Sequence, residues 1–154
     1  MSDTFTGVPA SPGIVIGPVH LLRWEVPEVP PHMVEPHEVD HEVARLDLAL
    51  ARAIERLRLV RARAEQHAGP EEAAIFDVQV SICEDADLRR SVETLIRQRF
   101  SAEKAFDLVL LEWREHFARS ANALMRERVS DITDVHIRVL SLLLDLPDYD
   151  PIGL

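Results

Sequence analysis

Cysteine is almost absent from this 154-residue sequence, which contains one, Cys83. A single thiol cannot form an internal disulfide, so the fold must be held by packing alone. The sequence also lacks a long apolar run, and its first residues lack the charged and then apolar order of a secretory leader. No phosphate-binding pattern of the G-x-x-x-x-G-K-[ST] or G-x-G-x-x-G type occurs. These absences predict a cytoplasmic protein without a membrane-spanning segment.

Basic residues are scarce as well, with 17 lysines and arginines against 27 acidic residues and a formal net charge of −10. Such a charge repels nucleic-acid phosphates and anionic membranes and favours a basic protein partner. We therefore expect neither nucleic acid nor membrane as a partner. The 47% of apolar residues is enough to close one packed core.

Proline and glycine are concentrated at one end of the chain. Seven of ten prolines and three of five glycines lie within residues 1–36, whereas residues 37–68 and 71–146 contain neither. The segment EVPEVPPHMVE, residues 25–35, is typical of an extended proline-rich connector. Before it, a broken apolar stretch favours one or two short strands, too few for an independent sheet. Its members are Ile14, Val15, Ile16, Val19, Leu21 and Leu22.

The remaining sequence has helical periodicity. A long amphipathic helix is predicted to begin after Pro36 and to end at Gly69–Pro70, because glycine stops helices and proline suits the first turn of the next one. Its apolar stripe is Val39, Val43, Leu46, Leu50, Ile54, Leu57, Val60 and Ala64.

Three more helices are predicted downstream. The second is broken or kinked at residues 84–87, where Asp85 or Asp87 can cap the continuation. The third begins after Ser101 and ends near Arg119, and the fourth covers about 122–144. Short links between four main helices predict an all-α, antiparallel four-helix-type bundle with a short extended or β N-terminal appendage. The expected divisions are the appendage (1–24), the connector (25–36), the helical domain (37–146) and a linker (147–154).

Three sets of residues have both a chemical and a structural interpretation. His37 and His41 form HEVDH, the spacing of a zinc protease, but Ala44 and Asp47 stand where one subclass needs glycine and histidine. Acidic residues are favoured at a helix start in any case, so we predict no metal site here. The lone cysteine reads as a packed helix thiol. The aromatic residues of the third helix read as bundle core: Phe106, Trp113 and Phe117.

The stretch GPEEAAIFDVQVSICEDADL, residues 69–88, is the most suggestive surface. Apolar side chains alternate there with acidic ones, and an apolar strip with an acidic rim suits a basic protein partner. The apolar members are Ile75, Phe76 and Ile82, and the acidic members are Glu71, Glu72, Asp77, Glu84, Asp85 and Asp87.

Four segments together resemble the N-terminal region of Enzyme I, the phosphoenolpyruvate-protein phosphotransferase of the bacterial sugar phosphotransferase system. They are GVPASPGIVIGPVHLL, DHEVARLDLAL, EEAAIFDVQVSICEDADL and RERVSDITDVHIRVL, and the likeness covers nearly all of residues 6–146. The resemblance implies that the helical part docks the phosphocarrier protein HPr. It also implies that the ASPGI strand belongs to a phosphohistidine domain whose remainder would follow the helices.

The resemblance assigns the docking surface residue by residue. Pro70 replaces an acidic residue expected beside the first member of the set, and Gln79 replaces a histidine often found there, so the carrier's identity stays open. The implied HPr-binding residues are Glu71, Ile75, Gln79, Ile82, Asp85, Asp87, Leu88 and Arg128.

The parent protein is expected to transfer phosphate from phosphoenolpyruvate to a histidine, with Mg²⁺, and then to the carrier. This chain has no G-G-x-T-S-H-type segment, so we predict that it is inactive alone, contains no cofactor and, without the dimerisation barrel, is a monomer. The alternatives are the equivalent domain of a nitrogen-related or dihydroxyacetone-related paralogue, or a non-catalytic helical adaptor.

Overall fold

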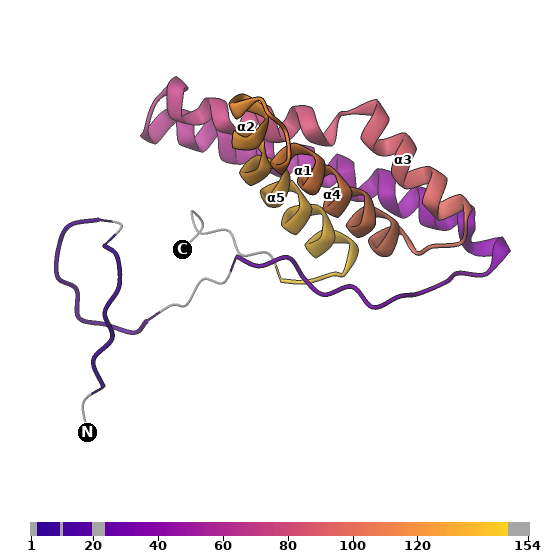
Figure 1. The fold of residues 1–154 in the computed structure, drawn as a ribbon. Helices are drawn as coiled ribbons and strands as arrows, with labels where there is room; N and C mark the ends of the chain where they lie inside the picture. The colour runs from indigo at the N-terminus through magenta and orange to yellow at the C-terminus, as the bar shows by residue number, and fades with distance from the viewer. Residues whose placement is uncertain (1–2, 10, 20–23, 148–154) are drawn as a thin grey trace.

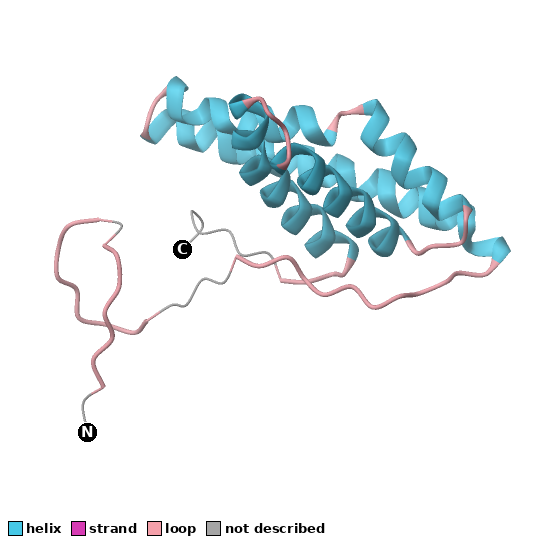
Figure 2. Cartoon of the chain, viewed as in Figure 1, coloured by secondary structure: helices cyan, strands magenta, loops and turns pink. Residues whose placement is uncertain are grey.

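The computed structural model describes residues 3–9, 11–19 and 24–147, and every regular element within them is a helix (Figures 1 and 2). This confirms the all-α prediction. A short 3₁₀ turn, Pro36–Glu38, leads into the first of five α-helices. They are α1 (Val39–His67), α2 (Pro70–Cys83), α3 (Ala86–Arg97), α4 (Ala102–Ala118) and α5 (Ala123–Leu143).

The helices form a four-helix-type bundle in which α2 and α3 together take the place of the second helix. Figure 1 shows α2 and α3 following one another along α1, with α4 and α5 packed beside them. The principal packed pairs are α1 with α2 and α4 with α5, and α5 also lies against α1 and α2. Among the residues that the structure describes, no helix is long and apolar enough to cross a membrane.

The helix boundaries lie where local chemistry favours them. Gly69 separates α1 from α2 with a φ of 108°, a left-handed conformation that glycine adopts without steric cost. Asp85 is the N-cap of α3 and follows the end of α2. Its Oδ1 accepts hydrogen bonds from the backbone amides of Asp87 (2.9 Å) and Leu88 (2.8 Å). Ser101 caps α4 in the same way by accepting from the Lys104 amide. The predicted break and both of these caps are therefore confirmed.

The core is formed by the apolar stripes of all five helices. Leu46 and Leu57 of α1 are fully buried, as are Phe106 of α4 and Leu140 of α5. Burying a side chain of this size stabilises the fold by about 1.5–3 kcal/mol before the entropy cost of ordering it. The predicted stripe of α1 is confirmed, since its remaining members are buried or half-buried.

The described part of the N-terminal appendage contains no strand. Ile14 and Ile16 are 96% and 99% exposed, and Val19 is 91% exposed. The expected strands are therefore not formed over residues 11–19, because a lone extended segment has no neighbour to complete a hydrogen-bonded ladder. The described residues of the appendage form no regular element and contain bends at 11–13 and 17, whereas Leu21, Leu22 and the linker from 148 onward lie outside the described residues.

Residues 24–35, which we call the strap, lie against the bundle and are held by side chains and backbone alike. Val29 and Val34 are buried, and the Val34 amide donates to the Arg99 carbonyl at 2.8 Å. Arg99 has a left-handed backbone (φ 77°), and its side chain returns the contact by donating to the Val34 carbonyl at 2.9 Å. The Ser101 amide donates to the carbonyl of His32 at 3.2 Å. The proline-rich connector is thus part of the packed structure.

A series of hydrogen-bonded polar side chains lies beneath the strap. Lys104 donates to the Val29 carbonyl at 3.2 Å and to Asp107 Oδ2 at 3.1 Å. The other carboxylate oxygen of Asp107 lies 3.0 Å from Nε2 of His136, whose side chain is fully buried. Burial lowers the pKa of His136 below its ordinary 6.5, although the Asp107 carboxylate opposes that shift. His136 therefore resists protonation in the folded chain.

Acidification should destabilise the fold through His136. The unfolded chain takes up a proton near pH 6.5 while the folded chain does not, so the free energy of unfolding should fall as pH drops below about 6.5, by at most about 1.4 kcal/mol per pH unit. Urea unfolding at pH 7, 6 and 5 measures this slope. His136→Gln keeps a donor for Asp107 without titrating and should flatten it, whereas His67→Gln, at an exposed position, should not. An equal slope in all three proteins would contradict this prediction.

Candidate functional site

A groove lies between α2, α4 and α5. Its volume is about 420 Å³. Three of the predicted docking residues line it: Ile82 near the end of α2, Asp85 at the α2/α3 break, and Arg128 on α5. The other lining residues are Val78, Ser81, Trp113, Phe117, Met125 and Ile132. Most of these side chains are apolar, so the groove offers a dry floor with charged groups at its edge.

Two charged residues of opposite sign stand at this groove. Asp85 is half-buried and uses one oxygen, Oδ1, for its two cap hydrogen bonds. Arg128 is exposed, and its Nη1 lies 3.4 Å from Oδ2 of Asp131, one turn further along α5. The Arg128 side chain is 50% exposed, whereas Asp131 is buried at 6% exposed. The guanidinium has five N–H donors, so it can donate to a partner's acceptor while it keeps its contact with Asp131.

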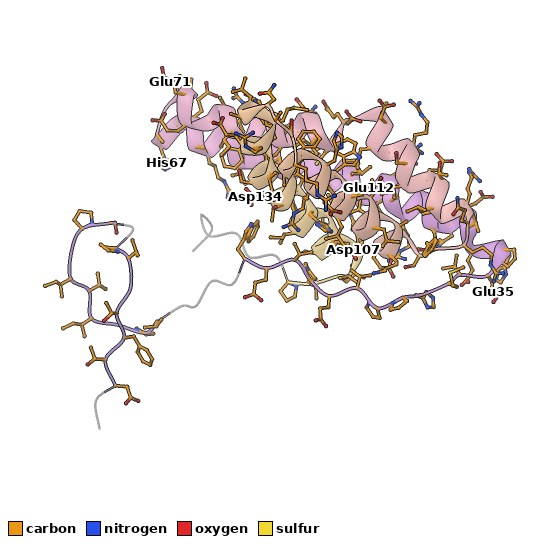
Figure 3. The ribbon with its side chains drawn as sticks, viewed as in Figure 1. Glu35, His67, Glu71, Asp107, Glu112 and Asp134 are labelled. Atoms are coloured by element: carbon orange, nitrogen blue, oxygen red, sulfur yellow. The ribbon has the colours of Figure 1, made fainter. Side chains whose placement is uncertain are left out.

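The other predicted docking residues divide into exposed and buried groups. Glu71, in the first turn of α2, is exposed and lies near the His67 end of the bundle (Figure 3). Ile75 is 50% exposed on the same helix, and the side chain of Asp87 is 79% exposed. Leu88 is 1% exposed and belongs to the core, while Gln79 is 3% exposed. The side chains of Leu88 and Gln79 are therefore not on the surface of the free chain.

Part of the acidic rim expected along residues 69–88 faces α1. Asp77 Oδ1 accepts from Arg61 at 2.6 Å, and Glu84 Oε1 accepts from Arg58 at 2.8 Å. These ion pairs tie α2 to α1 across the hairpin and reduce the negative charge available beside the groove. Asp85 lines the groove, and Asp87, two positions later, is exposed and lies 3.0 Å from Nη2 of the similarly exposed Arg90.

The aromatic pair on α4 is the main feature of the groove that sequence reasoning missed. Phe106 is fully buried, which confirms its assignment to the core. Trp113 and Phe117 are only half-buried, and they stack on each other with ring centroids 6.2 Å apart and an interplanar angle of 18°. Their i, i+4 spacing is common to core and surface stripes, so the sequence alone could not show that one side of the stack is open. Met125, 37% exposed on α5, extends this apolar floor.

Residues 6–128 match the family model described as "PEP-utilising enzyme, N-terminal". The chain belongs to this family. It is 34% identical over 149 residues to a phosphoenolpyruvate-protein phosphotransferase of Geobacillus stearothermophilus, covering 96% of this chain and 25% of that relative. A phosphoenolpyruvate-protein phosphotransferase of Cupriavidus necator is 34% identical over 142 residues, covering 92% and 24%. The chain therefore spans about a quarter of the length of these relatives.

Solved structures agree with the fold. A structure described as the N-terminal domain of Enzyme 1 - Nitrogen superposes with a TM-score of 0.71 at 28% identity, covering 80% of this chain and 51% of that one. A solution structure described as Enzyme I superposes with a TM-score of 0.72 at 24% identity, covering 79% and 49%, which supports the fold alone. The resemblance to the N-terminal region of Enzyme I, and the helical architecture that it implied, are confirmed.

The zinc-protease spacing of HEVDH has no geometric support in the described residues. His37 lies in the 3₁₀ turn and His41 at the exposed start of α1. Across residues 3–9, 11–19 and 24–147, no group of three His, Cys, Asp or Glu side chains is placed to hold a metal ion. Cys83 is buried, and burial raises the pKa of its thiol to about 12, so it stays protonated. The packed-thiol prediction is confirmed.

Proposed function

We propose that this chain is the carrier-docking domain of an Enzyme I-type phosphoenolpyruvate-protein phosphotransferase, and that its partner is an HPr-like phosphocarrier protein. The observation that carries the proposal is the α2/α4/α5 groove, which joins an apolar floor to Asp85, Arg128 and the neighbouring Asp87. Membership of the family, and relatives that are phosphotransferases, support it.

Docking would use the two parts of this surface differently. The net charge of −10 and the exposed carboxylate of Asp87 attract a basic partner and raise its rate of encounter. Ile82 and the Trp113–Phe117 stack then exclude water at the centre of the contact, where apolar anchors provide most of the affinity. Arg128 would pair with an acceptor on the carrier, because its guanidinium is exposed beside the groove.

The contribution of this domain to catalysis would be positioning. Holding the carrier's histidine close to the phosphohistidine of the parent protein makes a bimolecular transfer effectively local. In the parent, phosphate would pass from phosphoenolpyruvate to a histidine with the help of Mg²⁺. The described residues offer no cluster suited to a metal, so we assign no metal-dependent step to them. We propose that the chain alone is a monomeric, catalytically inactive cytoplasmic module.

The test is an NMR titration of isotope-labelled HPr from the same organism with the unlabelled chain. Docking should shift carrier signals around its active-site histidine and the adjoining helix, and the shifts should weaken as salt is added. A non-catalytic adaptor would leave the spectrum unchanged. A nitrogen-related carrier is the second candidate, because a solved relative at 28% identity is a nitrogen-type Enzyme I domain. It is titrated in the same way.

Asp87→Lys should raise the dissociation constant about tenfold or more, which corresponds to about 1.4 kcal/mol. The change reverses a charge at an exposed position beside the groove, so the effect should lie mainly in the association rate and should shrink in high salt. Glu71→Lys tests the other end of α2 in the same way. The measurement is association kinetics at low and high salt.

Two further variants separate charge from fold. Glu55→Lys makes the same charge change on α1, which does not line the groove, and should leave affinity nearly unchanged. Asp85→Asn keeps a good helix cap while removing the charge, so it should weaken binding without lowering stability. Equal affinities for the Asp87→Lys and Glu55→Lys proteins would contradict docking at this groove.

A further inference from the structure

Asp134 of α5 joins two segments that are far apart in the sequence. Its Oδ1 accepts a hydrogen bond from the indole Nε1 of Trp24, at the start of the strap, at 2.7 Å. Its Oδ2 accepts from Nε2 of Gln79, on α2, at 3.2 Å. Figure 3 shows Asp134 on the side of the helices along which the strap runs. One carboxylate therefore contacts both the strap and the helix that lines the groove.

The strap side of this contact has more than one attachment. The guanidinium of Arg138, one turn beyond Asp134 on α5, lies 6.0 Å from the centre of the Trp24 ring, within the range of a cation–π contact. Two residues after Trp24, Val26 packs against the core. Hydrogen bonds to a charged acceptor are roughly twice as strong as neutral ones. The indole is thus held by its polar atom and by its face.

Gln79, the α2 residue of this contact, depends on Asp134 more strongly than Trp24 does. Gln79 is 3% exposed, and the other amide atom, Oε1, has no hydrogen-bond partner among the described residues. Asp134 therefore provides the hydrogen bond that offsets the cost of burying this amide. Gln79 lies one turn after Ile75 and one turn before Ile82 on the same stripe of α2. A shift of the Gln79 side chain would move the stripe that meets the partner.

We propose that Asp134 is a positioning residue that couples the start of the strap to α2. Through it, occupation of the groove and the attachment of Trp24 would influence each other, so that docking is felt at the point where the appendage joins the bundle. The coupling between Trp24 and Gln79 stands on the geometry alone. Its consequence for docking rests on the proposed function.

The coupling is measured on the isotope-labelled 154-residue chain without any partner. The chain contains two tryptophans, so its two indole N–H signals are assigned with Trp113→Phe. Gln79→Leu removes the donor to Asp134 from α2 and should shift the Trp24 indole signal, although Trp24 itself is unchanged. Gln66→Leu, at an exposed position of α1, should leave that signal in place. Equal spectra for the two leucine variants would overturn the coupling.

Asp134→Ala tests the attachment itself. We expect the order parameter of the Trp24 backbone amide to fall from about 0.85, the value of a rigid backbone, to below about 0.6. Asp134→Asn serves as the second variant because it retains an acceptor for the indole while presenting an amide group to Gln79. It should keep Trp24 ordered and still shift its indole signal. A rigid Trp24 in the Asp134→Ala protein would contradict the proposed attachment.

Adding unlabelled HPr to the labelled chain then separates this proposal from the docking proposal. Trp113 lines the groove, whereas Trp24 is not among its lining residues. Shifts of both indole signals would support coupling of docking to the strap. A shift of Trp113 alone would overturn that coupling and leave the docking function intact. If neither signal shifts, docking of HPr is contradicted, and the Gln79→Leu comparison still decides whether Asp134 couples the strap to α2.

Discussion

Replacing Glu42 with alanine should lower the free energy of unfolding by about 1–3 kcal/mol, the cost expected when a buried donor, here the Ala102 amide, loses its hydrogen-bond partner. Glu42 is 6% exposed in the first turns of α1. Its carboxylate accepts from Arg45 Nη1 at 2.7 and 2.9 Å and from the Ala102 amide at 2.7 Å. The last contact caps α4 from another helix, because Ala102 is the first residue of α4 and is fully buried.

The loss should be large because Arg45 links further elements. Its Nη2 donates to the carbonyl of Leu143, the last residue of α5, at 2.9 Å, and its Nη1 lies 3.1 Å from Glu103. Removing Glu42 would leave a buried amide without a partner and would weaken the ion cluster that joins the starts of α1 and α4 to the end of α5. A loss of this size is a substantial part of the about 5–15 kcal/mol typical of whole domains.

Urea unfolding of the wild type and of three variants tests the role of Glu42. Asp40→Ala, at a position whose side chain is 94% exposed on the same helix, should change stability by less than about 0.5 kcal/mol. Glu42→Gln keeps an acceptor for Ala102 and should lose less than the alanine variant. Equal stability of the Glu42→Ala and Asp40→Ala proteins would contradict a structural role for the cluster.

The Glu42 cluster should also respond to acid. Burial of the Glu42 carboxyl opposes its ionisation, but the hydrogen bonds from Arg45 and the Ala102 amide outweigh burial and hold its pKa below the ordinary 4.5. A lowered pKa in the folded state means that this stabilisation is present above about pH 4.5 and is lost as pH falls through the folded value. The stability of the Glu42→Gln protein should therefore fall less steeply below pH 4.5.

Local signals explain why the helices could be predicted from the sequence. Gly69, Asp85 and Ser101 act on the backbone within a few residues of themselves, by a left-handed turn or by a side-chain cap. The Glu42 cap could not be predicted, since it joins residues 60 positions apart. In the sequence Glu42 reads only as an acidic residue at a helix start. The docked strap was missed for the same reason, because proline spacing indicates an extended segment without indicating its neighbour.

The candidate site was likewise predicted only in part. Ile82 and Asp85 are three residues apart, and the local pattern of residues 69–88 already placed both on one surface. The resemblance alone added Arg128, and the structure brings all three around one groove. Sequence patterns cannot show how far a helical stripe is covered by its neighbours. Trp113 packs against the core, as predicted, and its open side also lines the groove. Leu88 read as surface although α1 and α4 pack against its helix.

Leu88→Ala should lower the free energy of unfolding by about 2–5 kcal/mol, the usual cost of truncating a buried leucine. Leu88 is 1% exposed and continues into Val92 and Ile96, both fully buried, along one stripe of α3. The same truncation of Ile75, which is 50% exposed, should change stability by less than about 0.5 kcal/mol. Thermal and urea unfolding of the two variants measure this contrast.

Binding should show the opposite order if the exposed residues make the docking contact. Ile75→Ala should raise the dissociation constant for HPr about five- to tenfold, since each factor of ten is about 1.4 kcal/mol. Leu88→Ala, measured well below its unfolding temperature, should change it less than about twofold, because its side chain is buried and does not reach a partner. A folded Leu88→Ala protein with weakened binding would show instead that the packing of α3 is needed to present the docking residues. Measuring both stability and affinity therefore separates the residues that contact the carrier from those that hold the surface in place.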